Sequence, residues 1–413
     1  MKKVLIILVF LSFGSIYAGG YRVALQGQRM LGMAHAGLSV FNNAETAFFN
    51  PAGIAFLDHK FSVSFGVSGI MSSVKFQNKM YNWQYETDNP LGTPFYLSLA
   101  YQFTEQVSAG LSIYTPFGSS TVWNDWAGSE IVNDISMKVF YVQPSLAYKF
   151  NDKLSIAASF ILAFGEVSYN KNINRYLTDE QGNKTNVQLE SGMTNAFGYG
   201  LSMAYKPCKE LNIGVNYRSS VTIDAQNGEA TFNNVPGFLA DKLKDTGFSA
   251  ELPMPAELGV GFSFKPSDKI LVAIDYNYTY WDIYQELKIV FDSKDLPPSI
   301  SEKNYHNTST FRIGTEYKAS DNIFIRAGYY MDESPLSKGH LSPETPSLTT
   351  DNITFGLGYQ TDKLAIDLSV LFLYGRERSD YTTVNEGLSN YKFGGTYLNS
   401  AIIPGIGISY NIK

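Results

Sequence analysis

Charged side chains recur on one row of the alternating pattern that fills the second half of this 413-residue chain. The row carries three arginines and four acidic residues: Arg218, Arg312, Arg326, Glu257, Asp275, Glu316 and Asp367. An arginine shielded from water could bind a carboxylate, because a guanidinium supplies both the opposite charge and paired hydrogen bonds. The same arginines could instead form ion pairs with the acidic residues of their row. For any single arginine, the residues favour the ion pair.

No group of residues predicts catalysis or metal binding. His35, His59, His306 and His340 are scattered without the spacing of metal ligands, and no Ser/His/acid group stands out. Cys208 is the only cysteine, so it cannot form an intramolecular disulfide. The net charge is −6 with no basic block, which does not favour a nucleic-acid partner. We therefore expect a protein that is not an enzyme and has no cofactor.

Apolar residues occupy every second position in about fourteen segments, which is the pattern of strands with two different faces. The segments lie at 61–67, 95–103, 107–113, 140–148, 154–164, 197–205, 211–223, 258–264, 270–280, 311–317, 323–329, 353–359, 364–374 and 402–410. An even number of alternating strands with abundant Tyr, Phe and Gly is typical of a transmembrane barrel. The sequence predicts an all-β, antiparallel barrel whose apolar row faces lipid and whose charged row faces the lumen.

The connections between these segments alternate strictly between short and long. The long ones lie at 74–93, 115–136, 168–192, 225–250, 282–308, 331–351 and 375–399. Outer-membrane barrels have short periplasmic turns and long extracellular loops. The alternation therefore predicts a bacterial outer-membrane protein with both termini on the periplasmic side.

The region before the first strand divides into two parts. Residues 1–18 have two lysines, an apolar run and small residues before Ala18, which predicts a cleaved signal peptide. Residues 19–57 are rich in Gly and Ala and end their helical character at Pro51, which predicts a small plug. Residues 58–413 form the predicted barrel. Its inward row is mostly small in the first six segments, so the lumen has room for the plug and an apolar ligand.

Four stretches of this sequence resemble one known family, the FadL/TodX outer-membrane channels for long-chain fatty acids and other hydrophobic compounds. The most specific is AHAGLSVFNNAETAFFNPAGIAFL, whose Asn50, Pro51 and Ala52 look like the plug motif of that family. The others are YTPFGSSTVWNDWAG, LPMPAELGVGFSFKPSDKILVAIDYNYTYW and FRIGTEYKASDNIFIRAGYYMDESP. They occur in the same order from the predicted plug to residue 335, so the resemblance extends over most of the predicted mature chain.

The resemblance implies a fourteen-stranded barrel with an N-terminal hatch and a mechanism of lateral release. A hydrophobic ligand would be captured between outer loops, bind inside the barrel, and leave sideways through a kink in the third strand after the hatch moves. Asn50, Pro51 and Ala52 would then be a movable gate, although a fixed turn is the alternative. Three residues could disturb the third strand: Gly110, Pro116 and Gly118.

A further candidate site lies in the loop VPGFLADKLKDTGF. Phe238, Leu239 and Leu243 have helical spacing there, which suits an apolar groove that captures the ligand. Ordinary packing of the loop explains the same spacing equally well. Two other functions stay open: a general porin for polar solutes, and a structural or adhesive barrel. The expected partners are a hydrophobic small molecule and outer-membrane lipids, and we expect a monomer. The identity of the ligand does not follow from the sequence.

Overall fold

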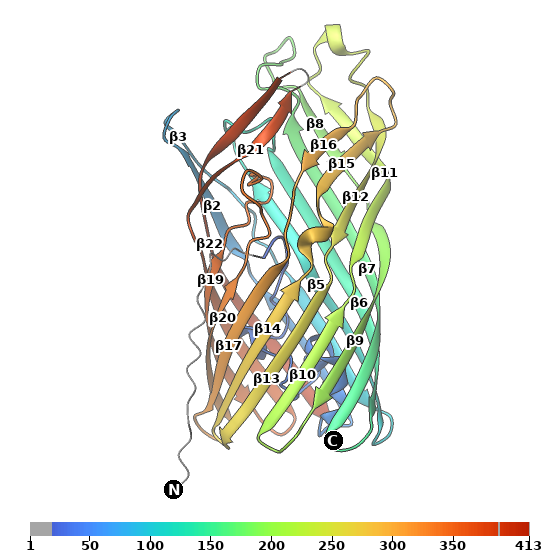
Figure 1. Cartoon of the computed structure of the whole chain (residues 1–413), viewed down its shortest axis with the longest axis vertical. Coiled ribbons are helices and arrows are strands. Elements are labelled where there is room, and N and C mark those ends of the chain that lie inside the picture. The colour runs from blue at the N-terminus through green and yellow to red at the C-terminus, as the bar shows by residue number, and fades with distance from the viewer. Residues whose placement is uncertain (1–18, 387–388, 413) are drawn as a thin grey trace.

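The computed structural model describes residues 19–386 and 389–412, so the predicted signal peptide lies outside the described residues. All of its strands join one antiparallel sheet that closes into a barrel of 14 wall strands, with the plug inside (Figure 1). The barrel closes where β1 pairs with β22, from Phe61 opposite Ile412 to Ser68 opposite Gly405. The predicted fold class is therefore confirmed.

Four of the wall strands are built from two consecutive pieces, and four short strands extend hairpins beyond the wall. The wall consists of β1 (Phe61–Ser68) with β2 (Met71–Asn78), β4 (Phe95–Gln102), β5 (Val107–Val122), β6 (Asp134–Lys149), β7 (Leu154–Asn172), β9 (Thr194–Tyr205), β10 (Leu211–Arg218) with β11 (Val221–Asn233), β12 (Thr246–Met254) with β13 (Glu257–Ser267), β14 (Ile270–Thr279) with β15 (Glu286–Phe291), β17 (Thr308–Lys318), β18 (Ile323–Asp332), β19 (Thr350–Gln360), β20 (Leu364–Gly375) and β22 (Ser389–Ile412). The short strands are β3 (Trp83–Glu86), β8 (Asn186–Glu190), β16 (Ser299–Glu302) and β21 (Arg378–Glu386).

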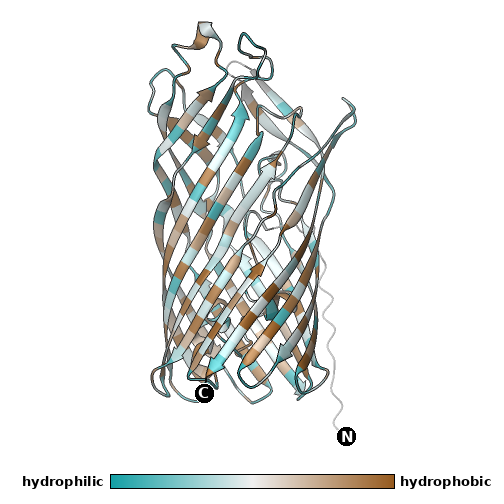
Figure 2. Cartoon of the chain, turned by 180° about the vertical axis from the view of Figure 1, so that it is seen from behind, coloured by the Kyte–Doolittle hydropathy of each residue, from teal (hydrophilic) through white to brown (hydrophobic). Residues whose placement is uncertain are grey.

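The wall has the two faces that the alternation predicts. Phe65 is 50% exposed whereas its neighbour Ser64 is fully buried. Figure 2 shows hydrophobic residues spaced along the lower part of the strands, where the wall would meet lipid. The charged row faces inward as predicted, and Asp275 and Arg326 are among its buried members.

Much of the sequence assigned to long loops is strand instead. β5 continues to Val122 and β7 to Asn172, and both keep regular antiparallel partners there. The alternation of apolar residues fades above the membrane because those strands no longer face lipid, although their backbones still pair. The predicted boundaries of the long connections are therefore wrong, while their order along the chain is confirmed.

The plug contains only short helical turns: α1 (Gln28–Leu31), α2 (Thr46–Phe49) and the 3-10 helix η1 (Pro51–Phe56). Two other 3-10 turns, η2 (Gly237–Leu239) and η3 (Trp281–Ile283), lie in outer connections. Among the described residues, no helix is both long and apolar enough to cross a membrane.

Wall glycines let the plug pack closely against the barrel. A Cβ atom at Gly214 would lie 1.8 Å from the carbonyl oxygen of Leu38, and one at Gly314 would lie 2.2 Å from that of Met33. Both distances are far too short for a side chain, so backbone meets backbone at these two points. The wall and the plug are thus shaped to each other.

Candidate functional site

The N-terminal end of the plug, Gly19–Leu25, pairs with the wall at an irregularity in β5. The ladder between β4 and β5 ends at the pair Tyr96 and Tyr114. Beyond it, the Val23 amide donates to the Pro116 carbonyl oxygen over 2.8 Å, and the Gly118 amide donates to the Tyr21 carbonyl oxygen over 3.0 Å. We call Gly19–Leu25 the N-terminal plug segment. It takes the place that a neighbouring wall strand would otherwise fill.

Two of the three residues suggested for a kink lie at this irregularity. The register between β5 and β6 shifts between Tyr114 and Phe117, so Pro116 is inside the shift and Gly118 directly follows it. Gly110 lies elsewhere, in a regular ladder opposite Ala100. A Cβ atom at Gly110 would lie 3.1 Å from that of Ala47 in the plug, which shows a role in close packing rather than in a kink.

A cavity of about 610 Å³ lies between β2, β4 and β5 beside the N-terminal plug segment, and we call it the wall cavity. Its lining includes the inward-facing Tyr330 and Asn352 as well as Phe95, which is 43% exposed on the lipid side. The wall cavity therefore reaches from the interior to the outer face of the barrel. Tyr21 and Arg22 form part of its inner end.

A second cavity, of about 90 Å³, lies above the plug and is almost entirely apolar. We call it the apolar cavity. Its lining includes Val167, Ile223, Phe248, Leu252, Leu287 and Ile289. Tyr21 lines it as well, so this side chain borders both the apolar cavity and the wall cavity. Tyr21 is held there by a hydrogen bond to the Pro253 carbonyl oxygen and by an edge contact with Trp281.

A third cavity, of about 70 Å³, borders the N-terminal plug segment and is lined by both charged and aromatic side chains. We call it the polar cavity. Four buried atoms of its lining have no hydrogen-bond partner among the described residues: Arg22 Nε, His35 Nε2, Arg218 Nε and Asp275 Oδ1. Burial lowers the pKa of His35 well below its usual range, and the charge of Arg312 acts in the same direction. The cavity suits water or a small anionic group, which would satisfy these atoms.

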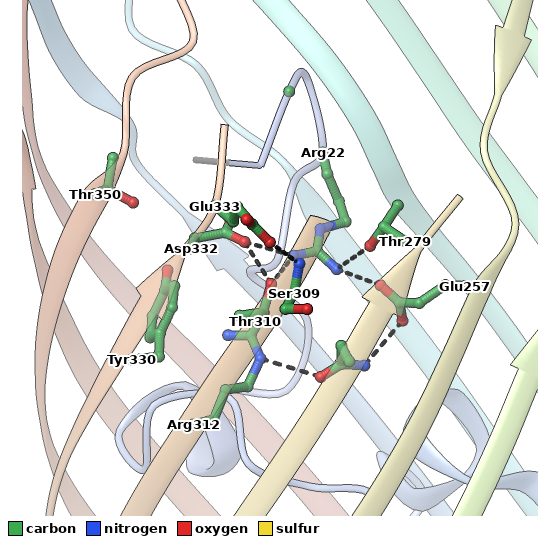
Figure 3. Close-up of polar contacts among 12 residues, drawn as sticks. Arg22, Glu257, Thr279, Ser309, Thr310, Arg312, Tyr330, Asp332, Glu333 and Thr350 are labelled. Carbon is green, nitrogen blue, oxygen red and sulfur yellow. Dashed lines mark hydrogen bonds and ion pairs between the residues drawn. The ribbon is translucent and has the colours of Figure 1, made fainter. Parts of the chain in front are cut away.

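Arg22 anchors the N-terminal plug segment to four wall strands, one of them through a hydrogen bond to Thr279 Oγ1 at 3.3 Å (Figure 3). Its guanidinium forms ion pairs with Glu257 and with Asp332, the latter at 2.8 Å, and donates to Thr310 Oγ1 at 2.8 Å. Burial alone would lower the pKa of Arg22, but the charges of Asp332 and Glu257 outweigh it and raise the pKa. The arginine therefore stays charged and bound.

A second set of ion pairs holds α1. Arg29 donates two hydrogen bonds to Glu316, at 2.9 and 2.6 Å. Arg326 donates to the same carboxylate at 2.7 Å and to Asp367 at 2.6 Å. Of the three arginines suggested as carboxylate partners, Arg326 is thus occupied by protein carboxylates. Arg218 lies 3.6 Å from Glu257 and donates to the Phe48 carbonyl oxygen, and Arg312 donates to Asn277 Oδ1 and the Ala34 carbonyl oxygen. Both arginines also line the polar cavity.

The motif Asn50, Pro51 and Ala52 lies at the base of the plug and is fully buried. The Asn50 amide donates to the carbonyl oxygens of Leu38 and Met203, both at 2.9 Å, and its Oδ1 accepts from the Ala52 amide. One of these bonds reaches the wall strand β9. The motif therefore ties two parts of the plug to the barrel.

The loop residues suggested for a capture groove lie outside these three cavities. Phe238 is 78% exposed, and Leu239 and Leu243 are half-buried in the same turn, where the Leu243 amide donates to the Leu239 carbonyl oxygen. Within the described residues, no cluster of three or more His, Cys, Asp or Glu could hold a metal ion.

Sequence reasoning missed Tyr21, Arg22, Lys303 and Glu344, which line the cavities. These residues lie in segments without period-two alternation, so a single sequence carries no signal that places them in the lumen. Tyr21 and Arg22 lie in the stretch GGYRVALQG of the predicted plug, so the sequence predicted their region but not their contacts.

Comparisons with known proteins agree on one family. A family model described as "Outer membrane protein transport protein (OMPP1/FadL/TodX)" matches residues 10–412. The chain is 24% identical to the long-chain fatty acid transport protein of Escherichia coli strain K12, over 94% of each chain.

Two crystal structures share the fold. A Pseudomonas aeruginosa FadL homologue superposes with a TM-score of 0.85 at 19% identity, over 96% of this chain and 100% of that one. The Ralstonia pickettii toluene transporter TbuX gives 0.70 at 15% identity, over 94% of this chain and 98% of that one.

Proposed function

This chain belongs to the OMPP1/FadL/TodX family of outer-membrane transport proteins, and from this premise we propose that it takes up long-chain fatty acids or other hydrophobic compounds. The Escherichia coli relative is named for long-chain fatty acid transport, and the Ralstonia structure for toluene transport. Both substrates are largely apolar, as is the lining of the apolar cavity. We propose a monomer with both termini in the periplasm.

The observation that carries this proposal is the position of Tyr21 between the apolar cavity and the wall cavity. A ligand that moves from the first to the second has to pass the N-terminal plug segment. From the wall cavity it can enter the membrane beside Phe95 without crossing water, which would cost about 0.8 kcal/mol per exposed CH₂. Lateral exit is therefore the route of lowest free energy for an apolar chain.

We propose four steps for uptake. The exposed turn of Phe238, Leu239 and Leu243 captures the ligand, and the apolar cavity then binds it. Next, the N-terminal plug segment separates from β5 at Pro116 and Gly118. The ligand finally leaves through the wall cavity, between β4 and β5.

The rest of the plug stays in place during this cycle. Asn50, Pro51 and Ala52 form the fixed base of the gate, since the Asn50 side chain bonds both plug and wall. Arg326 donates to Glu316, the carboxylate that also binds Arg29 of α1. We assign Arg218 and Arg312 to the polar cavity, where they hold water or a small anionic group outside the apolar path.

A reversible cross-link tests the gate. Arg22 and Phe117 are paired in an antiparallel bridge, and such partners lie about 4.5 to 5.5 Å apart at Cα, within disulfide range. The variant Arg22→Cys/Phe117→Cys is made in a Cys208→Ser background, and its reduced form, which lacks the Arg22 ion pairs, serves as the reference with a loosened segment. We expect oxidation to reduce uptake of radiolabelled lipophiles to the level of cells without the protein, and reductant to restore it. Transport that continues in the oxidised protein would exclude this gate.

A space-filling substitution tests the apolar cavity independently. Ala225 is 4% exposed and lines that cavity, so Ala225→Trp should block binding and uptake. Ala109 belongs to the lipid-facing row of β5, and Ala109→Trp is the matched control that should leave both unchanged. Equal uptake by the two variants would argue against this binding site.

A further inference from the structure

The lining of the apolar cavity includes two charged residues, Lys303 and Glu344, and these form an ion pair with each other. Lys303 Nζ donates to Glu344 Oε2 over 2.5 Å, and the two side chains are 4% and 9% exposed. The Tyr169 hydroxyl lies 2.9 Å from the other carboxylate oxygen and shares its proton between that oxygen and the Ile131 carbonyl oxygen, and Ser342 donates to Oε2 over 3.0 Å. Both oxygens of Glu344 are therefore bound, and Lys303 already has a carboxylate.

The contacts of Glu344 favour its charged form. This residue lies in the connection between β18 and β19, where burial alone would raise its pKa. The charge of Lys303 and the hydrogen bonds from Lys303, Tyr169 and Ser342 outweigh burial and lower the pKa. The pair of Lys303 and Glu344 is thus neutral as a whole, and the remaining lining of the apolar cavity carries no charged side chain.

A second carboxylate at this position would meet a high cost. It would have to displace Glu344 and leave that carboxylate buried without its partner, or share one ammonium with it in a region of low dielectric. An uncharged head group meets neither cost, because it adds no charge to be compensated. Lys171 interacts electrostatically with Glu344, but it does not line the cavity and cannot receive a head group there.

We propose that the apolar cavity selects uncharged lipophiles, such as hydrocarbons and esters, over fatty-acid carboxylates, because Glu344 occupies the place opposite Lys303. The inference rests on the proposed function and narrows its substrate class. The carboxylate of Glu344 acts as a built-in substitute for an acidic ligand. Removal of its charge should convert the site into one that accepts a carboxylate.

Two ligands of similar and small size test the preference, because the apolar cavity has a volume of about 90 Å³. The full-length protein is purified in detergent and titrated with toluene and with sodium benzoate at slightly alkaline pH, by competition with a fluorescent neutral probe. We expect toluene to bind at least about tenfold more tightly. In Glu344→Gln, benzoate binding should strengthen by roughly tenfold while toluene binding stays the same. Glu166→Gln, which removes an exposed carboxylate, should behave as wild type.

The outcomes separate the two proposals. Tighter binding of benzoate than of toluene by the wild-type protein, which needs no variant, would overturn the preference and leave lipophile uptake intact. An unchanged benzoate affinity in a folded Glu344→Gln would also overturn it. Binding of neither ligand would overturn the proposed function and the preference together.

Discussion

The backbone amide of Val23 donates a hydrogen bond to the carbonyl oxygen of Pro116 over 2.8 Å, and so joins the plug to the wall where β5 no longer pairs with β4. An unpaired strand edge inside a membrane protein leaves polar backbone groups without partners, which is costly in lipid. The N-terminal plug segment satisfies part of that edge. In the proposed cycle its departure would expose the edge again, and the bound ligand would then have to cover it.

Replacement of Tyr21 by alanine should open a direct passage between the apolar cavity and the wall cavity. The side chain is buried and packs edge-on against Trp281, with ring centroids 4.7 Å apart, so its loss leaves a void at the junction. We expect Tyr21→Ala to release bound lipophile faster by an order of magnitude or so, measured by stopped-flow displacement. Tyr21→Phe keeps the ring and should stay close to wild type. Equal release rates for the two variants would contradict this role.

Arg22→Met should detach the N-terminal plug segment while the barrel remains folded. The substitution leaves Glu257 and Asp332 without their shared cation, and loss of one partner of a buried ion pair costs about 3 to 5 kcal/mol. We expect faster proteolysis at the N-terminal plug segment and a larger ion leak in planar bilayers.

The control for Arg22→Met is Lys138→Met. Its ion pair with Glu166 is solvent-exposed, with Lys138 70% exposed, and such pairs contribute about 0 to 1 kcal/mol. This variant should show neither effect. A proteolysis pattern that is the same in both variants would show that Arg22 does not anchor the segment.

Plug docking should depend on pH through Glu45. Burial raises its pKa to about 7, and the charge of Asp367 adds to this, against the hydrogen bond from Tyr96 and the charges of Arg29 and Arg326. The buried Glu45 Oε2 has no hydrogen-bond partner among the described residues. Because the pKa is higher in the docked plug than the ordinary 4.5, docking binds a proton. It should strengthen as the pH falls from above 7 towards 4.5, by on the order of 3 kcal/mol.

Hydrogen exchange of plug amides between slightly alkaline and mildly acidic pH measures this dependence. Glu45→Gln keeps a group that can accept from Tyr96 and removes the charge, so its plug should be equally protected across that range. Glu105→Gln, in an exposed turn, should retain the wild-type dependence. A pH dependence that survives in Glu45→Gln would assign it to other groups.

Asn50→Ala should loosen the base of the plug. The substitution removes two hydrogen bonds to carbonyl oxygens and leaves the Ala52 amide with one acceptor fewer, at a fully buried site. We expect a loss of about 1 to 3 kcal/mol in plug docking, seen as faster proteolysis near residue 50. Asn151→Ala removes a comparable capping side chain in an exposed turn and should leave the plug protected. Equal protection in both variants would show that Asn50 does not anchor the plug.

The wall was predictable from sequence because a barrel in lipid has to repeat one rule at every strand. Phe65 faces lipid and its neighbour Ser64 faces the plug, which is why the two residues differ in polarity. The two faces of the wall can therefore be recognised from alternate residues. The strand segments above the membrane do not alternate in this way. The sequence therefore predicts ends for β5 and β7 that lie before their ends in the structure, at Val122 and Asn172.

The site was less predictable because its residues act through contacts between distant segments. Arg22 meets Asp332 across 310 positions, and Lys303 meets Glu344 from a separate connection. Nothing in the local pattern tells an arginine of the plug apart from one exposed in a loop. The inward arginines are predictable because they share a strand row with acidic residues, and Arg326 forms ion pairs with two residues of that row, Glu316 and Asp367.

The pairing of β1 with β22 has a consequence for biogenesis. The seam joins the first wall strand to the last, so the cylinder cannot shut until the whole polypeptide has reached the assembly site. The plug precedes every strand, and its arginines bind carboxylates on β13, β17 and β18. The plug therefore cannot complete these ion pairs before the second half of the chain has been made.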